Sequence, residues 1–358
     1  MPTRFHVASR EPITRAGGLH NYVLSLSDGQ RQLGLRALIA HEVARGATFS
    51  TLGASEHIRP MDLASDDSIH LHFAQSARLM RPALRGTNAR IIFHFHGPWA
   101  AEGRAQGNGG LTQAVKYFIE RTEYRRHGSF VVASDAFGEV LAHRYGVPAE
   151  QITTVYPGVD TVRFTPGDRR AARLRLGVDP DRPTITCVRR LEPRMGLRHA
   201  LEAAKKFPEA QLLIAGTGSM ESELSSKIEE LDLVGRAHLL GRVPNEQLPD
   251  VFRAGDVTLV PSLALEGFGL VVLESMACGT PVVATRVGGL PEAMGPFADN
   301  YCIDEASNVE AMVHLARAAI DAGEPLAVAV RNFAQKRSLK TMAHNVERVV
   351  KGAHHALV

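Results

Sequence analysis

The sequence predicts an α/β protein with two doubly wound, Rossmann-like domains that face a cleft. The chain has 358 residues, whereas one domain usually has ~100–200. Short β-rich runs alternate with amphipathic stretches along most of its length, which is the element order of parallel sheets with helices on both faces. Open sheets of this kind bind ligands at the carboxyl ends of their strands, so we expect the functional residues in the loops there.

The first domain is expected to span residues 1–163. Its N-terminal run enters a strand at once, without the basic start and long apolar stretch of a secretory signal, and this favours a cytoplasmic protein. Turn residues and apolar patterns predict one open sheet with six strands and three helices. The strands are expected at 4–8, 35–39, 68–73, 90–95, 129–133 and 151–155, and the helices at 18–31, 111–127 and 135–145.

The second domain is expected to span residues 164–338, with the boundary placed where the pattern breaks near Pro166-Gly167. Its strands are expected at 184–188, 211–215, 237–240, 256–260 and 281–284, and its helices at 196–206, 220–231, 246–253 and 269–278. Helical patterns then fill 307–322 and 325–355 without a further strand. The last segment, 339–358, is expected to be a C-terminal helix that crosses back onto the first domain.

Composition argues against several classes of protein. The 41 basic and 38 acidic residues give a net charge of +3, which is too small to indicate a nucleic-acid partner. No apolar run approaches the ~20 residues that a transmembrane helix needs. The three cysteines, Cys187, Cys278 and Cys302, are odd in number and widely spaced. We therefore expect buried, reduced thiols rather than disulfides or a zinc site.

Several loops at the expected strand ends carry residues suited to phosphate. Gly17-Gly18 lies between a strand and a helix, where the backbone can approach an anion closely, although paired glycines are as often a tight turn. Arg189, Arg190 and Arg194 stand before another expected helix, where guanidinium groups can bind a diphosphate or can simply be solvated. Similar glycine-bearing turns occur at Gly216-Thr217-Gly218, Gly241-Arg242-Val243-Pro244 and Val287-Gly288-Gly289.

The most informative segment runs from Pro261 to Gly279 and contains Glu266 and Glu274. Glu266 lies in a loop, and Glu274 lies about one turn into an otherwise apolar helix. A carboxylate in such a helix needs a donor, either a ribose diol or a neighbouring arginine. The amides of residues 268–270 are suited to phosphate or to sugar hydroxyls.

These residues carry a resemblance to a known family. Glu266 and Glu274, with Gly-Phe-Gly-Leu between them and Ala-Cys-Gly-Thr-Pro-Val-Val after them, closely resemble the E-x7-E motif of the retaining glycosyltransferases of family four, the glycosyltransferase group 1 enzymes. Gly17-Gly18, the segment Tyr156–Asp160 and Arg190-Leu191 match further motifs of that family in order, so the resemblance covers nearly the whole chain. It implies the two-domain GT-B fold, with a nucleoside diphosphate sugar held by the second domain.

The resemblance also implies roles for individual residues. Arg190 would bind the diphosphate, and Glu274 the ribose hydroxyls. Glu266 would contact the hydroxyls of the sugar and would be a catalytic residue that positions it. The other donor-binding residues would be Gly17 and Gly18, the amides of Gly267, Phe268, Gly269 and Leu270, and, around the base, Gly216, Arg242 and Val243. Where the family usually has lysine before glycine, this chain has Met195. We expect Arg194 to take the role of that lysine.

Histidine pairs offer a candidate catalytic residue and a weak metal signal. His70 and His72, like His94 and His96, are two residues apart on expected strands and so face the same side. No carboxylate or cysteine has ligand spacing nearby, so we expect packed or hydrogen-bonded histidines and no metal. The loop from His96 to Trp99 resembles the family's first-domain histidine loop, which implies that His96 lies beside the donor sugar and that His94 is structural.

The resulting prediction is a metal-independent, retaining hexosyltransferase without a cofactor. The string Asp179-Pro180-Asp181 resembles metal-binding D-x-D, but its place between prolines indicates a turn. Donors with UDP or GDP are expected, and the acceptor stays open between a small molecule, a glycan and a lipid-linked sugar. Two alternatives stay open, a GT-B sugar-nucleotide 2-epimerase and a non-catalytic sugar-nucleotide-binding protein.

A basic amphipathic stretch at 114–127 leaves peripheral membrane contact open. Four arginines, Arg78, Arg81, Arg85 and Arg90, cluster upstream of it. Basic faces of this kind are more often solvated than bound to lipid. We therefore expect a solvated face, with contact at the inner face of the membrane as the alternative.

Overall fold

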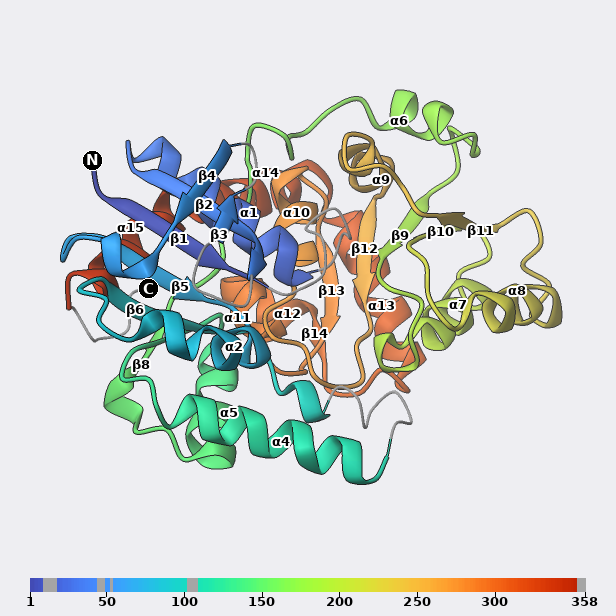
Figure 1. Cartoon of the computed structure of the whole chain (residues 1–358). Helices are drawn as coiled ribbons and strands as arrows, with labels where there is room; N and C mark the ends of the chain where they lie inside the picture. Colours follow the sequence, from blue (N-terminus) through green and yellow to red (C-terminus); the bar gives the residue numbers. More distant parts are fainter. Residues whose placement is uncertain (9–17, 44–48, 52–53, 102–108, 353–358) are drawn as a thin grey trace. The chain divides into compact units, whose positions relative to one another are not determined.

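The chain folds as two compact units, each built on its own sheet (Figure 1). The computed structural model describes residues 1–8, 18–43, 49–51, 54–101 and 109–352. The first unit comprises Met1–Gly158 and the C-terminal segment from Ser338, and the second comprises Val159–Arg337. The chain therefore passes from the first unit to the second and returns once.

The first unit contains an eight-stranded sheet. Its strands are β1 (Thr3–Val7), β2 (Arg36–Val43), β3 (Phe49–Thr51), β4 (Ala54–Ile58), β5 (Ser68–Leu71), β6 (Arg90–Phe95), β7 (Phe130–Val132) and β8 (Ile152–Thr154). They are arranged in the order β4-β3-β2-β1-β5-β6-β7-β8, with β3 antiparallel to both of its neighbours and all other pairs parallel. The strand order reverses between β1 and β5, so the carboxyl ends of these two strands mark a ligand-binding position.

Helices cover both faces of this sheet. They are α1 (Gly18–Gln32), α2 (Ala74–Leu84), α4 (Leu111–Tyr124), α5 (Asp135–Tyr145) and α15 (Leu339–Val350), with short 3-10 turns at Pro60–Asp62 and Ala149–Gln151. Helix α15 packs against α1 and buries Met342 and Val346 beside Tyr22 and Leu26. The C-terminal helix thus belongs to the first unit.

The second unit contains a six-stranded, fully parallel sheet. Its strands are β9 (Thr184–Val188), β10 (Gln211–Ala215), β11 (Ala237–Gly241), β12 (Val257–Val260), β13 (Val282–Thr285) and β14 (Cys302–Ile303). The order β11-β10-β9-β12-β13-β14 is that of a dinucleotide-binding Rossmann sheet, 3-2-1-4-5-6. Its switch point lies between β9 and β12.

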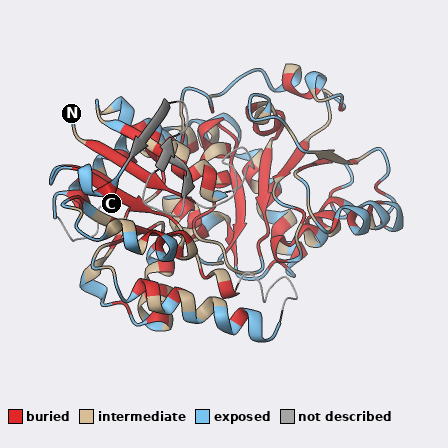
Figure 2. Ribbon diagram, viewed as in Figure 1, coloured by how far each residue is buried: buried red, intermediate tan, exposed pale blue. Residues whose placement is uncertain are grey.

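The helices of the second unit complete the doubly wound arrangement. They are α6 (Arg169–Arg175), α7 (Leu197–Lys205), α8 (Glu221–Glu230), α9 (Leu248–Ala254), α10 (Leu270–Ala277), α11 (Leu290–Met294), α12 (Ala298–Tyr301), α13 (Val309–Asp321) and α14 (Gly323–Lys336), with 3-10 turns at Pro193–Met195 and Gly295–Phe297. Figure 2 shows the described strands as mostly buried ribbons with exposed helix faces around them. All three cysteines are buried and unpaired, as predicted.

Three elements differ from the sequence-based predictions. The expectation of no strand after 284 was wrong, because Cys302 and Ile303 pair with Ala284 and Thr285. The single helix expected at 325–355 is two helices, because Arg337 leaves helical geometry and the Ser338 side chain caps α15 by accepting from Thr341 N. Helix α2 was not predicted because Pro82 lies inside it, and proline usually ends a helix.

The boundary between the units lies five residues before the expected one at 163, after Gly158. The Phe164 ring packs edge-on against Phe252. The Arg331 guanidinium donates to the carbonyls of Thr161 and Phe164. These contacts attach the start of the linker to the second unit.

Candidate active site

The loops at the carboxyl edge of the second sheet are hydrogen-bonded to one another. Leu263 N, after β12, donates to Arg194 O, after β9, at 2.8 Å, and Gly289 N, after β13, donates to Glu266 O at 3.0 Å. On the other side of β9, Gly216 N donates to Gly241 O at 2.8 Å. The loops that the sequence singled out therefore form one connected edge around the switch point.

Two glycines allow these loops to approach one another. A Cβ atom on Gly196 would lie 1.8 Å from Pro261 O, and one on Gly288 would lie 2.1 Å from Glu266 O. Both glycines also have positive φ angles, 70° and 54°, which side chains disfavour. Glycine is thus required where the β9 and β13 loops support the loop that carries Glu266.

Glu266 is held by an ion pair that the sequence did not identify. Arg189 Nη2 donates to Glu266 Oε2 and to Ser262 Oγ, and Ser262 Oγ donates to the same carboxylate oxygen at 3.0 Å. The side chains of Arg189 and Glu266 are 6% and 14% exposed. Burial alone would raise the pKa of Glu266, but the charge and hydrogen bond of Arg189, with Arg194 and Ser262, outweigh it and lower that pKa.

The second oxygen of this carboxylate has a different environment. Among the described residues, no donor is hydrogen-bonded to Glu266 Oε1. Leu265, directly before it, has a φ of 56°, a strained conformation for a side chain with a Cβ. The structure therefore presents a charged carboxylate on a constrained loop, with one oxygen able to accept a ligand hydroxyl.

The three arginines of the β9 loop occupy different positions. Arg194 is 8% exposed, and its Nη1 donates to Leu265 O at 3.0 Å, so it supports the Glu266 loop directly. Arg190, the expected diphosphate ligand, is exposed. Arg189 is the one paired with Glu266. Arg189 and Arg190 are adjacent and of the same residue type, so only the structure shows which of them contacts Glu266.

Glu274 lies on the first turns of α10, as predicted, and is partly buried. Burial raises its pKa to about 7, although the positive charge of Arg163 opposes the shift. Among the described residues, no hydrogen-bond donor contacts its carboxylate. A partly buried carboxylate without a donor is what a binding site for a diol would contain before its ligand arrives.

The helices of this edge begin without side-chain caps. Helices α7, α10 and α11 start after Gly196, Gly269 and Gly289, and none of these starts has a side-chain cap. By contrast, Asp168 caps α6 and Asn308 caps α13. Uncapped helix starts can bind anions. Of the predicted amide ligands near α10, Gly267 and Leu270 are partly exposed, whereas Phe268 and Gly269 are buried.

The remaining predicted ligands are spread over both units. Gly216 and Val243 are partly buried, and Arg242 is exposed, in the loops after β10 and β11. In the first unit, Gly18 is the exposed first residue of α1, and Gly17 lies outside the described residues. His96 follows β6 and is partly exposed, with its Nε2 3.0 Å from His72 Nδ1.

The histidines are hydrogen-bonded, as predicted. Within the described part of the chain, no group of three or more His, Cys, Asp or Glu side chains has a metal-binding arrangement. His94 is buried between Tyr22 and His70, with contacts of 3.1 and 2.9 Å. It is a structural residue in this fold.

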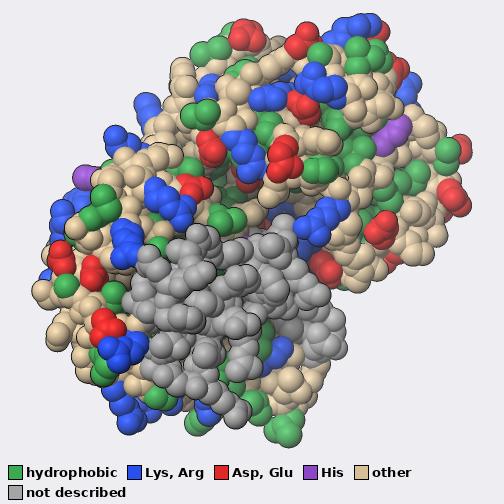
Figure 3. Space-filling model, turned by 45° about the horizontal axis from the view of Figure 1, so that its top comes forward, with side chains coloured by type: hydrophobic (Ala, Val, Ile, Leu, Met, Phe, Trp, Pro, Cys, Tyr) green, Lys and Arg blue, Asp and Glu red, His purple; other side chains and the backbone are tan. Residues whose placement is uncertain are grey.

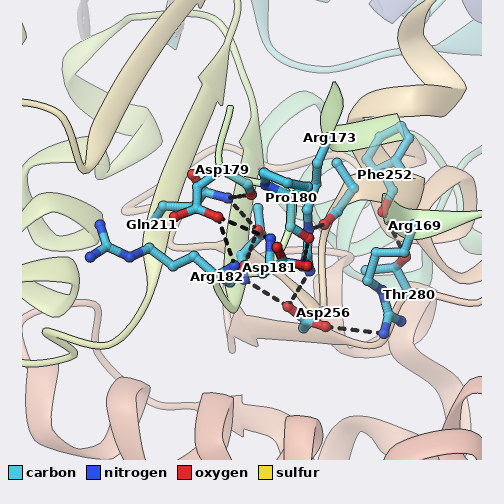
Figure 4. Close-up of polar contacts among 12 residues, drawn as sticks. Arg169, Arg173, Asp179, Pro180, Asp181, Arg182, Gln211, Phe252, Asp256 and Thr280 are labelled. Carbon is cyan, nitrogen blue, oxygen red and sulfur yellow. Dashed lines mark hydrogen bonds and ion pairs between the residues drawn. The ribbon is translucent and has the colours of Figure 1, made fainter. Parts of the chain in front are cut away.

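The D-x-D string is a turn, as predicted (Figure 4). Asp179 Oδ1 accepts from the amides of Asp181 and Arg182 at 3.0 and 3.3 Å, and Asp181 pairs with Arg170. The turn leads into β9 at its amino end, opposite the edge that carries Glu266. Asp256 fixes it by accepting from Thr184 N and pairing with Arg173.

The basic helix α4 and the arginines upstream of it have mixed environments. On the one face that Figure 3 shows, basic and acidic side chains are interspersed outside the grey atoms. Arg81 pairs with Glu123, and Arg90 Nη1 donates to Val350 O, so these two arginines support the fold. Leu111, Val115 and Phe118 of α4 are exposed. Among the described residues, no helix is long and apolar enough to cross a bilayer.

Comparison with known proteins supports the family that this edge suggests. Residues 168–337 match the sequence model of the glycosyl transferases group 1, and residues 59–163 match that of glycosyltransferase family 4. A D-inositol 3-phosphate glycosyltransferase of Mycobacterium sp. (strain KMS) is 39% identical over 179 residues, which are 49% of this chain and 40% of the relative. The match thus spans less than half of that relative's length.

Solved structures show the same fold over the whole chain. Alr3699/HepE of Anabaena in complex with UDP superposes with a TM-score of 0.76 at 18% identity, covering 99% of this chain and 100% of that chain. Sucrose-phosphate synthase of Thermosynechococcus elongatus gives 0.77 at 20% identity, covering 98% of each chain. The chain is therefore a member of the group 1 glycosyltransferases of family 4, with the GT-B fold.

Proposed function

We propose that the protein is a retaining glycosyltransferase that moves a hexose-type sugar from UDP or GDP to a hydroxyl acceptor, without a metal. The observation that carries this proposal is the ionised Glu266, fixed by Arg189 at the switch point of a Rossmann sheet with uncapped helix starts around it. A protein of the same fold supports UDP as the donor nucleotide, since Alr3699/HepE was solved with UDP-glucose.

In the proposed donor complex, each part of the edge has one task. Glu274 accepts from the ribose hydroxyls, and Arg190 with the start of α10 binds the diphosphate. Glu266 Oε1 accepts from a hydroxyl of the sugar. Arg194 supplies positive charge from behind the Glu266 loop, in addition to its bond to Leu265 O.

In the proposed reaction, the bond from the anomeric carbon to the phosphate oxygen breaks, and a bond to the acceptor oxygen forms on the same face. The acceptor proton passes to an oxygen of the leaving diphosphate. Positive charge grows on the sugar and negative charge on the phosphate. The Glu266 carboxylate stabilises the positive charge on the sugar. Arg190 and the start of α10 stabilise the negative charge on the phosphate and so take the place of a metal ion.

Thermal-shift screening in EDTA against UDP-, GDP-, ADP- and dTDP-sugars tests the donor. Stabilisation by UDP- or GDP-sugars supports the proposal, and stabilisation by ADP- or dTDP-sugars alone contradicts the proposed donor. Stabilisation that requires added Mg²⁺ contradicts metal independence. Incubation of the stabilising donor alone separates the epimerase alternative, which would form the epimer without an acceptor. D-inositol 3-phosphate is a rational first acceptor, because the mycobacterial relatives are named for it.

A further inference from the structure

Five histidine rings from three adjacent strands of the first unit form two hydrogen-bonded chains. His6 lies on β1, His70 and His72 on and after β5, and His94 and His96 on and after β6. Neighbouring rings are stacked or tilted, with centroids 4.5 Å apart for His72 and His94 and 5.3 Å apart for His72 and His96.

One chain leads from an ion pair to His96. The Arg4 guanidinium binds the Glu347 carboxylate of α15, with Nη2 2.7 Å from Oε2. Gln30 Nε2 donates to Glu347 Oε1 at 3.3 Å, and Gln30 Oε1 lies 2.7 Å from His6 Nε2. His6 Nδ1 then lies 3.0 Å from His72 Nε2, and His72 Nδ1 lies 3.0 Å from His96 Nε2.

The direction of every hydrogen bond in this chain follows from its first member. A carboxylate paired with arginine only accepts, so the Gln30 amide nitrogen faces Glu347 and its oxygen faces His6. That oxygen also only accepts, so His6 carries its proton on Nε2. A neutral His6 then accepts at Nδ1 from His72 Nε2, and a neutral His72 accepts at Nδ1 from His96 Nε2. His96 is left with its proton on Nε2 and an unprotonated Nδ1.

Removal from water keeps these rings neutral, His96 included although it is partly exposed. Burial is the main cause that lowers the pKa of His6 to about 4 and that of His96 to about 3, and it lowers the pKa of His72 well below its usual value. Among the described residues, no group is hydrogen-bonded to His96 Nδ1. That nitrogen is therefore an acceptor at neutral pH.

The second chain has no such fixed direction. Ser68 Oγ lies 2.8 Å from His70 Nε2, His70 Nδ1 lies 2.9 Å from His94 Nε2, and His94 Nδ1 lies 3.1 Å from Tyr22 Oη. Hydroxyl groups at both ends can donate or accept, so either direction satisfies it. It provides a built-in control for the first chain.

We propose that Gln30, His6 and His72 are positioning residues that hold His96 as a neutral imidazole with a bare Nδ1, which accepts a hydrogen bond from a hydroxyl of the substrate. The proposal rests on the proposed function for its ligand, a sugar. A neutral acceptor suits that role, because an imidazolium would repel the positive charge that grows on the sugar during transfer.

Nitrogen NMR of the full-length chain with ¹⁵N-labelled histidine tests the proposal without any substrate. Long-range proton–nitrogen spectra distinguish protonated from bare ring nitrogens, and His96→Asn assigns the His96 signals by their loss. We expect a single neutral form of His96 with the proton on Nε2 from pH 6 to 8. A proton on Nδ1, or a mixture of both forms, in the wild-type protein overturns the proposal.

Gln30→Met and Ser68→Ala form the matched pair of variants. Gln30→Met removes the acceptor for His6 and should convert His96 to a mixture of both forms, with turnover lowered about tenfold and donor affinity unchanged. Ser68→Ala shortens the second chain and should leave the His96 signals as in the wild type. If His96 in folded Gln30→Met still shows a single form with the proton on Nε2, the positioning role of the first chain is contradicted. If the first chain fixes the proton of His96 as expected but the protein transfers no sugar, the proposed function fails and the positioning of His96 stands.

Discussion

Arg189 Nη2 and Glu266 Oε2 form a largely buried ion pair that joins the loop after β9 to the loop after β12. These two strands are neighbours at the switch point of the second sheet, so the pair fixes the place where ligands bind in sheets of this kind. Breaking one partner of a buried pair leaves the other charge uncompensated.

Arg189→Met should therefore lower the free energy of unfolding by about 3–5 kcal/mol. Arg190→Met is the adjacent control, because Arg190 is exposed, and it should change stability by less than about 0.5 kcal/mol. If Arg190 binds the diphosphate, only its variant should weaken the binding of the nucleoside diphosphate in a folded protein. Urea unfolding and calorimetric titration measure both effects. Equal loss of stability in the two variants would contradict the distinction.

Glu274→Gln should stabilise the protein and weaken donor binding. Because burial raises the pKa of Glu274 to about 7, the folded state holds this proton more tightly than the unfolded state, and the stability cost appears as the pH rises from about 4.5 to above 7. At pH 8 the variant should be more stable by about 1–3 kcal/mol, and at pH 4.5 it should match the wild type. Loss of a ribose acceptor should raise the donor Kd about tenfold or more. A stabilised variant with unchanged Kd would remove Glu274 from the site.

Gly288→Ala should disturb the Glu266 loop. Its added Cβ would lie 2.1 Å from the backbone oxygen of Glu266, whereas a Cβ on Gly235 would meet nothing within 4 Å. Both glycines have positive φ, so Gly235→Ala measures the cost of the conformation alone. We expect Gly288→Ala to be the less stable of the two by about 1–3 kcal/mol and to lose activity. Equal melting temperatures for the two variants would show that the loop yields without cost.

The first unit should lose stability as the pH falls below about 6.5. The clustered histidines have folded pKa values below the unfolded value, about 4 for the buried His6 and about 3 for the partly exposed His96. The unfolded state therefore binds protons first, and stability that is complete above pH 6.5 is lost toward the folded pKa values. Each such histidine contributes a slope of about 1.4 kcal/mol per pH unit. Urea unfolding at pH 7, 6 and 5 measures the slope, and a flat profile would contradict neutral, buried rings.

Much of the fold could be predicted from the sequence, because long alternations of apolar patterns and turn residues determine it. The strands of the second sheet up to β13 were placed within one or two residues. The hairpin of β3 and β4 was missed because its strands have three and five residues and lack an alternating apolar pattern. The two-residue β14 is too short for any periodicity.

Those features of the site that depend on residue type and spacing could be predicted from the sequence. The pattern of apolar and turn residues predicts that Glu266 lies in a loop and that Glu274 lies in an apolar helix. The pairing of Glu266 with Arg189 does not, because the direction of a side chain in a loop depends on tertiary contacts such as those of Ser262. The histidine chain to His96 likewise joins residues from four elements, which spacing along the sequence cannot show.

Single-turnover measurement with Glu266→Gln tests whether the Glu266 carboxylate is required for sugar transfer. The protein is loaded in EDTA with the sugar nucleotide that stabilises it and mixed with acceptor, and release of the nucleoside diphosphate is followed beside the calorimetric donor Kd. Glu229→Gln, at an exposed position on α8, is the control and should behave as the wild type. We expect Glu266→Gln to lower turnover about a hundredfold and to leave the donor Kd nearly unchanged. Wild-type turnover in folded Glu266→Gln would contradict the proposed role of Glu266.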